Sequence, residues 1–118
     1  MEKLICNNMT AVLISPGYGA GWSTWFHCEN DDLIKQAVFD PELAQAVLDK
    51  PQDSSQKEFN LWLAYIKEIC ERKYPNQYTG GVGDLEVRWV PVGARFRIHE
   101  YDGHEYVEIY NPDSYMTA

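Results

Sequence analysis

Residues 95–109, RFRIHEYDGHEYVEI, are the stretch that best indicates how this chain folds. Asp102-Gly103 is a preferred pair for the two-residue type I′ turn of a β-hairpin. The cross-strand pairs that such a turn predicts are Tyr101–His104, His99–Tyr106, Arg97–Glu108, Ile98–Val107 and Phe96–Ile109. The last two pairs are apolar and share one face, whereas the first three share the opposite face. We therefore predict an antiparallel hairpin with one face in the core.

Two further stretches are predicted to be β-structure. Residues 3–15 form a hairpin around Asn7-Asn8, because asparagine tolerates the positive φ of a type I′ turn. Its second arm is apolar at four consecutive positions, 11–14, which is typical of a strand covered on both faces. Residues 85–89 alternate between apolar and charged side chains and predict a half-buried strand, ended by Pro91 and Gly93.

Helices are predicted between these strands. Asp40-Pro41 has the form of a helix start and predicts a helix to about Lys50. The sequence from Ser55 to Glu58 has capping-box form, and the apolar spacing after it predicts a helix ending near Tyr74-Pro75. Residues 31–38 predict a short helix, with a strand as the alternative.

The order of these elements predicts an α+β fold. We expect one antiparallel sheet of about five strands with two or three helices packed on one face. With 118 residues, the chain has the length of one domain, residues 1–118.

Composition narrows the class of partner. The formal charge of -8 disfavours direct nucleic-acid binding, because phosphate contacts need a basic surface. The same charge would attract a protein with a basic surface. No apolar run is long enough to span a bilayer, so no membrane contact is expected. The opening residues reach Asn7-Asn8 too early for a signal-peptide core.

The cysteines indicate the redox compartment. Three widely spaced cysteines without a CxxC pair favour a reduced cytoplasm over a disulfide framework. We expect Cys6 and Cys70 to be small core side chains. Cys28, beside His27, is the one candidate for a reactive thiol.

The segment 16–28 and the acidic pair Asp31-Asp32 after it hold the candidate binding residues. Three glycines lie beside four aromatic residues, and aromatic side chains are enriched at protein interfaces and stack on planar ligands. Core packing is the competing explanation. The loop has no lysine or arginine, and it contains neither the GxGxxG motif of dinucleotide-binding proteins nor the GK[ST] motif of a P-loop. Phosphate binding is therefore not expected. The candidate partner- or ligand-binding residues are Tyr18, Trp22, Trp25, Phe26, Asp31 and Asp32.

Catalytic and metal signatures are absent from the sequence. The histidines His27, His99 and His104 have no metal-ligand spacing, so neither a metal nor a cofactor is expected. Glu100 and Glu105 are predicted to face each other across the hairpin, where like charges destabilise. A cation such as Arg88, solvation near the turn, or a functional carboxylate pair with a raised pKa would resolve that conflict.

Three segments resemble a group of small uncharacterised proteins encoded by phages and prophages. They are SPGYGAGWSTW from Ser15 to Trp25, the turn at residues 39–41, and WVPVGARFRIHEYDG from Trp89 to Gly103. The resemblance implies expression in the cytoplasm of a bacterial host cell. It also implies a role typical of small acidic accessory proteins, namely inhibition of host defence or host transcription by stoichiometric binding.

Taken together, these observations predict a non-enzymatic binding protein. It would dock on a host defence or nucleic-acid-handling protein through an acidic surface and the aromatic loop. The alternative is a small-molecule binder that holds a nucleotide-like ligand between aromatics, with an arginine from Arg88, Arg95 or Arg97. An enzyme using His27 and Cys28, or the Glu100–Glu105 pair, is a third reading. A homodimer is also open, because hairpins leave strand edges.

Overall fold

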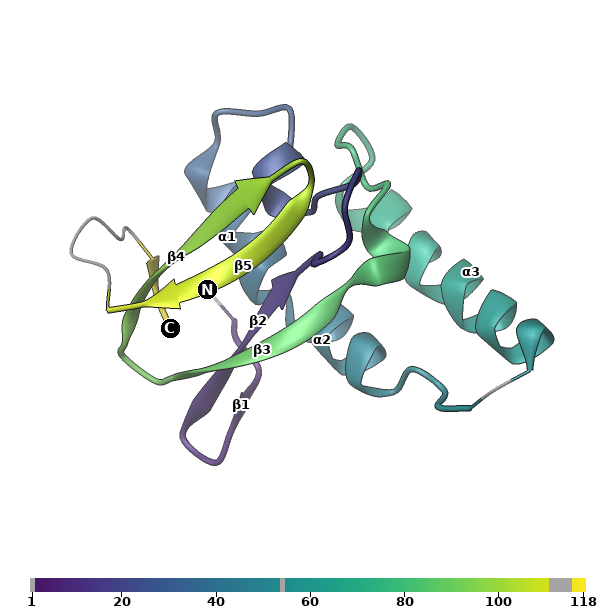
Figure 1. Cartoon of the computed structure of the whole chain (residues 1–118), viewed down its shortest axis with the longest axis horizontal. Coiled ribbons are helices and arrows are strands. Elements are labelled where there is room, and N and C mark those ends of the chain that lie inside the picture. Colours follow the sequence, from purple (N-terminus) through teal and green to yellow (C-terminus); the bar gives the residue numbers. More distant parts are fainter. Residues whose placement is uncertain (1, 54, 111–115) are drawn as a thin grey trace.

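Two three-stranded antiparallel sheets make up the β-structure in a computed structural model, which describes residues 2–53, 55–110 and 116–118 (Figure 1). The first sheet has the order β1-β2-β3 and the second has the order β5-β4-β6. The strands are β1 (Ile5–Cys6), β2 (Met9–Ile14), β3 (Glu86–Pro91), β4 (Arg95–Tyr101), β5 (His104–Ile109) and β6 (Met116–Thr117).

Both predicted hairpins are confirmed in their register. All five cross-strand pairs predicted for residues 95–109 are present between β4 and β5. The turn residues Asp102 and Gly103 have φ values of 50° and 84°. At the β1–β2 turn, Asn7 and Asn8 have φ values of 51° and 64°. These are the positive values that a type I′ turn requires at both central residues.

Among the described residues, three α-helices lie between β2 and β3 in the chain: α1 (Asp31–Phe39), α2 (Pro41–Leu48) and α3 (Gln56–Lys73). Each begins at a side chain that accepts backbone N–H groups, namely Asn30 for α1, Asp40 for α2 and Ser55 for α3. Such caps satisfy donors that the first helical turn leaves free. The short helix predicted for residues 31–38 is therefore confirmed, and the strand alternative is wrong. Two short 3₁₀ turns, η1 (Ser23–Trp25) and η2 (Val82–Asp84), lie in the glycine-rich loops.

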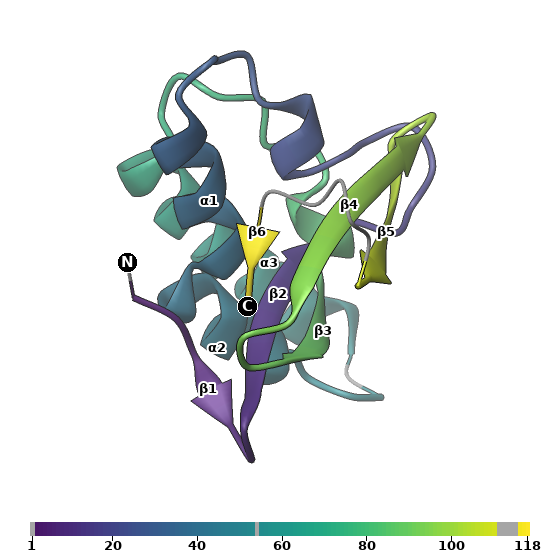
Figure 2. The same cartoon turned by 90° about the vertical axis from the view of Figure 1, so that its left-hand side faces the viewer.

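Strand β2 is the centre of the fold. Ala11 and Leu13 belong to a core shared with the helices, whereas Val12 and Ile14 belong to a core shared with the second sheet. Figure 2 shows β2 between the helices on one side and β4 and β5 on the other. All four side chains are buried. The prediction that residues 11–14 are covered on both faces is confirmed, because one face meets the helices and the other meets the second sheet and the end of α1.

The division into two sheets corrects the prediction of one sheet of about five strands. Between β3 and β4 the chain turns sharply, with Gly93 at φ 85° and the N–H of Ala94 donating to Pro91 O at 2.9 Å. Proline offers no N–H to continue the ladder, so the chain leaves the first sheet here. The helices cover one face of the first sheet, and the second sheet, together with Val38 and Phe39 of α1, covers the other face.

The two cysteines predicted to be core side chains differ in their burial. Cys70 is buried as predicted, but the expectation for Cys6 is wrong, because it lies exposed on the short strand β1. That strand extends past the helices that would have covered it (Figure 1). Among the helices of the described ranges, not one combines the length and apolar character needed to cross a membrane.

Candidate functional site

The first glycine-rich loop and the tip of the β4–β5 hairpin meet at the buried carboxylate of Glu105. One carboxylate oxygen, Oε1, accepts the N–H of Ser15 at 2.9 Å. The other, Oε2, accepts the N–H groups of Trp22 at 3.0 Å and Thr24 at 3.1 Å, together with the Thr24 hydroxyl. Glu105 is fully buried, so its charge is stabilised by this set of uncharged donors.

The backbone N–H groups that a phosphate cradle would use are already occupied in this loop. The loop does present backbone N–H groups to an anion, as a phosphate cradle would. The anion is the chain's own Glu105 carboxylate, and it occupies these donors from within the fold. The N–H of Glu105 in turn donates to Ser15 O at 2.9 Å. Glu105 therefore joins the loop to the hairpin from both its side chain and its backbone.

Two glycines allow the loop to be held closely on both sides. Gly103 has a φ of 84°, and a Cβ atom at this position would overlap the backbone nitrogen of Ala20. A Cβ atom at Gly81, in the second glycine-rich loop, would lie only 2.5 Å from Gly21 O. Neither approach leaves room for a side chain. The first loop is therefore packed between the hairpin tip and the second glycine-rich loop.

Four aromatic rings lie in a continuous stack on the outer face of the hairpin, and we call them the ring row: Tyr18, His104, Tyr106 and His99. Successive ring centroids are 4.9, 5.8 and 5.0 Å apart, with interplanar angles of 19°, 29° and 16°. Three of the rings come from β4 and β5, and Tyr18 comes from the glycine-rich loop. The loop thus adds a fourth ring to those that the hairpin supplies.

Hydrogen bonds fix both histidines of the ring row. Nδ1 of His104 bonds to Pro16 O, and because a carbonyl oxygen only accepts, Nδ1 carries the proton. Nε2 of His99 contacts a carboxylate oxygen of Glu108 at 2.7 Å. The ring orientations are therefore set by the fold.

The ring row is largely open to solvent at two of its members. Tyr18 is 69% exposed and Tyr106 is 47% exposed. The faces of the inner rings, His104 and Tyr106, are covered by their neighbours in the stack. The surface therefore offers ring edges and tyrosine hydroxyls along its length, and one open ring face at Tyr18.

Trp25 belongs to a second aromatic group beside the hairpin tip. Its indole N–H donates to a carboxylate oxygen of Glu100 at 2.8 Å, and the N–H of Gly103 donates to the same oxygen at 2.8 Å. The Trp25 hydrogen bond, followed by that of Gly103, lowers the pKa of Glu100. Tyr78 lies against the Trp25 ring at 5.3 Å. Trp25 is half-buried, so part of its ring remains accessible.

The predicted conflict between Glu100 and Glu105 is resolved by these N–H donors. The two residues do face each other across the hairpin. Arg88 is not their counter-ion, because it pairs with Glu86 at 2.6 Å. The pKa of Glu100 is lowered, which is opposite to the shift expected of a functional carboxylate pair. Separate sets of donors stabilise each carboxylate.

The structure separates the six residues predicted to bind a partner. Tyr18 and Trp25 lie at the hairpin tip, and Asp31 and Asp32 are exposed in the first turn of α1. Trp22 and Phe26 are in the core. The expectation that Trp22 is a surface ring is wrong: it is fully buried, its indole N–H donates to Ala37 O at 3.0 Å, and Phe26 packs edge-on against it at 5.1 Å.

Glu105 and the rings of His99, His104 and Tyr106 were not among the residues predicted to bind a partner. A signal for both was present in the hairpin register. Alternation places Glu105 on the same face as Val107, which is the core face, and a carboxylate there needs donors from another segment. The same register aligns His99, Tyr106 and His104 on the outer face. The contribution of Tyr18 carries no such signal, because it depends on how the loop folds back.

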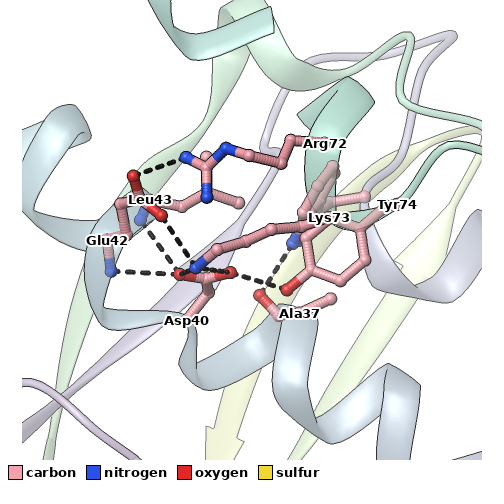
Figure 3. A network of polar contacts seen from close by, with 8 residues as sticks. Ala37, Asp40, Glu42, Leu43, Arg72, Lys73 and Tyr74 are labelled. Atoms are coloured by element: carbon pink, nitrogen blue, oxygen red, sulfur yellow. Dashed lines mark hydrogen bonds and ion pairs between the residues drawn. The ribbon is translucent and has the colours of Figure 1, made fainter. Parts of the chain in front are cut away.

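A second polar cluster connects α2 to the end of α3 (Figure 3). Asp40 is buried and accepts the N–H groups of Glu42 and Leu43, the ammonium of Lys73 at 3.1 Å and the hydroxyl of Tyr74 at 2.6 Å. Lys73 also pairs with Glu42 at 3.0 Å. The adjoining hollow, of about 320 Å³, is lined by Glu2, Asp32, Gln36, Asp40, Pro41 and Lys73.

The charge states of this cluster favour a structural role. Burial acts to lower the pKa of Lys73, but its contacts with Glu42 and Asp40 outweigh burial and raise it, so the side chain is an ammonium. Burial raises the pKa of Tyr74, with the Asp40 contact acting in the same direction. Burial also raises the pKa of the Cys70 thiol to about 12. Such groups are neither activated nucleophiles nor bases near neutral pH.

The His27–Cys28 pair does not form a catalytic arrangement either. His27 is exposed, its ring centroid lies 6.3 Å from that of Tyr78, and its backbone N–H donates to Gln77 Oε1 at 2.8 Å. Within the described ranges, no group of three or more histidine, cysteine or acidic side chains is arranged to hold a metal ion.

Comparisons with protein-family models, curated proteins and solved structures find nothing that matches this chain. Its function is therefore argued from the hairpin tip, the ring row and the charge of the molecule.

Proposed function

We propose that this chain is a non-enzymatic binding protein that docks on another protein through the ring row. The observation that carries the proposal is the stack itself, in which Tyr18 and Tyr106 remain exposed while His99 and His104 are fixed by hydrogen bonds. Aromatic residues supply much of the binding energy at protein interfaces. A core explanation does not apply to these rings, because they lie on the solvent side of the hairpin.

The rigidity of this surface favours binding. Ordering a side chain on association costs about 0.5–1.5 kcal/mol when the side chain is mobile beforehand. In the ring row, stacking and hydrogen bonds order the rings before any partner arrives. Glu105 holds the loop that carries Tyr18 in the same way. A partner therefore meets a surface that needs little rearrangement.

Charge indicates the chemistry of the partner. The chain carries a formal charge of -8, and Asp102 and Glu108 are exposed on the hairpin that carries the ring row. A field of this sign attracts a basic protein surface and raises its association rate. We propose a host protein with a basic surface as the partner, in keeping with the inhibitor role that the phage resemblance implies.

The alternative function, a pocket that holds a nucleotide-like ligand between aromatics, has less support. A base stacks between two rings only where a gap separates them. In the ring row the neighbouring rings already contact one another, and Trp22 is buried in the core. Protein contact uses the exposed edges and hydroxyls that remain.

Site-specific photo-crosslinking in bacterial lysate, at a series of ionic strengths, tests the proposal. A photoreactive phenylalanine analogue would replace Tyr18 or Tyr106 in the ring row, one position at a time. The matched controls carry it at Leu61 or Tyr65 on α3, which are 64% and 50% exposed. We expect a discrete adduct with a basic protein from the ring-row positions alone, and less adduct as ionic strength rises.

Two results would overturn the proposal. Adducts of equal yield from the α3 positions would show that the ring row is not the contact surface. A Tyr18→Ser/Tyr106→Ser variant that keeps its fold and captures the same protein as strongly as the unmodified chain would lead to the same conclusion. A rise in thermal stability with nucleotides, lost in that variant, would favour the alternative function.

A further inference from the structure

We propose that the free edge of β3 pairs with β3 of a second copy of this chain. Among the described residues, β3 is an outer strand of the first sheet and has β2 as its one strand partner. Val92 donates its N–H to Asn8 O at 3.1 Å, and this bond shows which residues of β3 form the hydrogen-bonded pairs with β2. Residues 86, 88 and 90 therefore direct their backbone groups to β2, and Val87 and Trp89 direct theirs outward.

This edge is available for pairing. Within the described ranges, no hydrogen bond occupies the outward N–H groups of Val87 and Trp89. The side chains along the strand are exposed or half-buried except Val90. Pro91 is the next residue directed outward, but it has no N–H to donate, so the row of outward donors ends at Trp89. A strand added here would meet two free donors within three residues, which is the chemistry of strand addition to a sheet edge.

The charged side chains of β3 favour pairing with β3 of a second copy, and they favour one register of that pairing. If two β3 strands pair antiparallel about Val87, Glu86 of each lies opposite Arg88 of the other. Both pairs then unite opposite charges, and cross-strand pairs of this kind stabilise a sheet. A shift of the register to centre on Arg88 would oppose two arginines, which is unfavourable. The strand is therefore complementary to itself in one alignment, as a two-fold symmetric interface requires.

The side chains needed for that exchange are on the surface. Glu86 and Arg88 contact each other within one chain at 2.6 Å, with side chains 52% and 46% exposed. Each would exchange this contact for the same contact across the two-fold axis. Beside the edge, a hollow of about 430 Å³ between the α2–α3 connection and β3 includes Leu85 and Val87 in its lining. It leaves room for side chains of the incoming strand.

Charge exchange tests this inference directly. Glu86→Arg or Arg88→Glu alone places like charges opposite each other in both symmetric pairs. We expect either variant to weaken self-association by about tenfold or more, measured by sedimentation velocity over a range of concentrations. An equimolar mixture of the two variants restores complementary pairs and should form the mixed dimer. The double variant Glu86→Arg/Arg88→Glu should associate like the unmodified chain.

A matched control separates the β3 pairing from net charge. Glu58→Arg on α3 makes the same change in formal charge as Glu86→Arg, and we expect it to leave self-association intact. A chain that is monomeric at every concentration overturns the inference, as does self-association that neither single variant weakens. If amide exchange at Val87 and Trp89 slows only when a different protein is added, that protein's strand is the occupant. None of these results depends on the ring row, so the two proposals fail separately.

Discussion

Glu105 and Trp22 are 83 residues apart in the chain, and yet the carboxylate of Glu105 accepts the backbone N–H of Trp22 at 3.0 Å in the interior of the fold. The contact connects the two unusual parts of the molecule, the hairpin and the glycine-rich loop. It places the Trp22 ring in the core and leaves Tyr18 outside, beside His104. The exposed ring row therefore depends on a buried carboxylate that itself contacts no partner.

Removing this carboxylate should destabilise the protein strongly. Glu105→Ala leaves the N–H groups of Ser15 and Trp22 without their acceptor in the interior. We expect a loss of about 3–5 kcal/mol in the free energy of unfolding, measured by urea denaturation, because each unsatisfied buried donor costs about 1–3 kcal/mol. Glu108→Gln on the exposed face of the same strand is the control and should cost less than about 1 kcal/mol. Equal losses in the two variants would contradict the anchoring role of Glu105.

Alanine substitutions at Gly103 and Gly93 distinguish the cost of backbone strain from the cost of steric overlap with the loop. Gly103 and Gly93 have φ values of 84° and 85°, so alanine is strained at both by about 1–2 kcal/mol. Only at Gly103 would the added Cβ atom overlap the backbone of Ala20, whereas at Gly93 it meets open space. We expect Gly103→Ala to lower the melting temperature clearly more than Gly93→Ala does. Similar shifts would show that the loop moves away from the hairpin tip without difficulty.

Local structure was the predictable part of the fold. The Asp102-Gly103 turn and the alternation around it determine the hairpin register within one short segment. The helix starts at Asp40 and Ser55 depend on side chains that cap their own helix. Each of these signals acts between residues close in the sequence, and for that reason the sequence alone reveals it.

The non-local part was not predictable in the same way. Pairing of β2 with β3, and the separation of β4 from β3, depend on which surfaces meet after the helices pack. Trp22 and Trp25 are both aromatic loop residues, and their different burial arises from contacts with Ala37 and with Glu100, respectively. No periodicity in a glycine-rich loop distinguishes two such rings. Of the four aromatic residues predicted to bind a partner, Tyr18 and Trp25 are therefore accessible, whereas Trp22 and Phe26 are buried.

Thr10 offers a test of the core between the sheets. Its side chain is fully buried, and its hydroxyl finds no hydrogen-bond partner among the described residues. Thr10→Val removes that hydroxyl and keeps a branched side chain on the strand, so we expect the free energy of unfolding to rise by about 1 kcal/mol. Thr117→Val, at an exposed position on β6, should give no comparable gain. A loss of stability in Thr10→Val would show that the hydroxyl is hydrogen-bonded in solution.

The ion pairs at the end of α3 predict an acid-dependent loss of stability. The hydrogen bond from Arg72, followed by that from Lys73, lowers the pKa of Glu42 below its ordinary value of 4.5. A carboxyl group with a lowered folded-state pKa stabilises the fold above its unfolded-state pKa, and the contribution is lost as pH falls through the folded-state value. Glu42→Gln should therefore be less stable than the unmodified chain at neutral pH, by less than about 1 kcal/mol because the pair is solvent-exposed. In urea denaturation at a series of pH values, the difference should be constant at neutral pH and shrink below about pH 4.5. A difference that persists unchanged to the lowest pH would assign the effect to lost packing instead of charge.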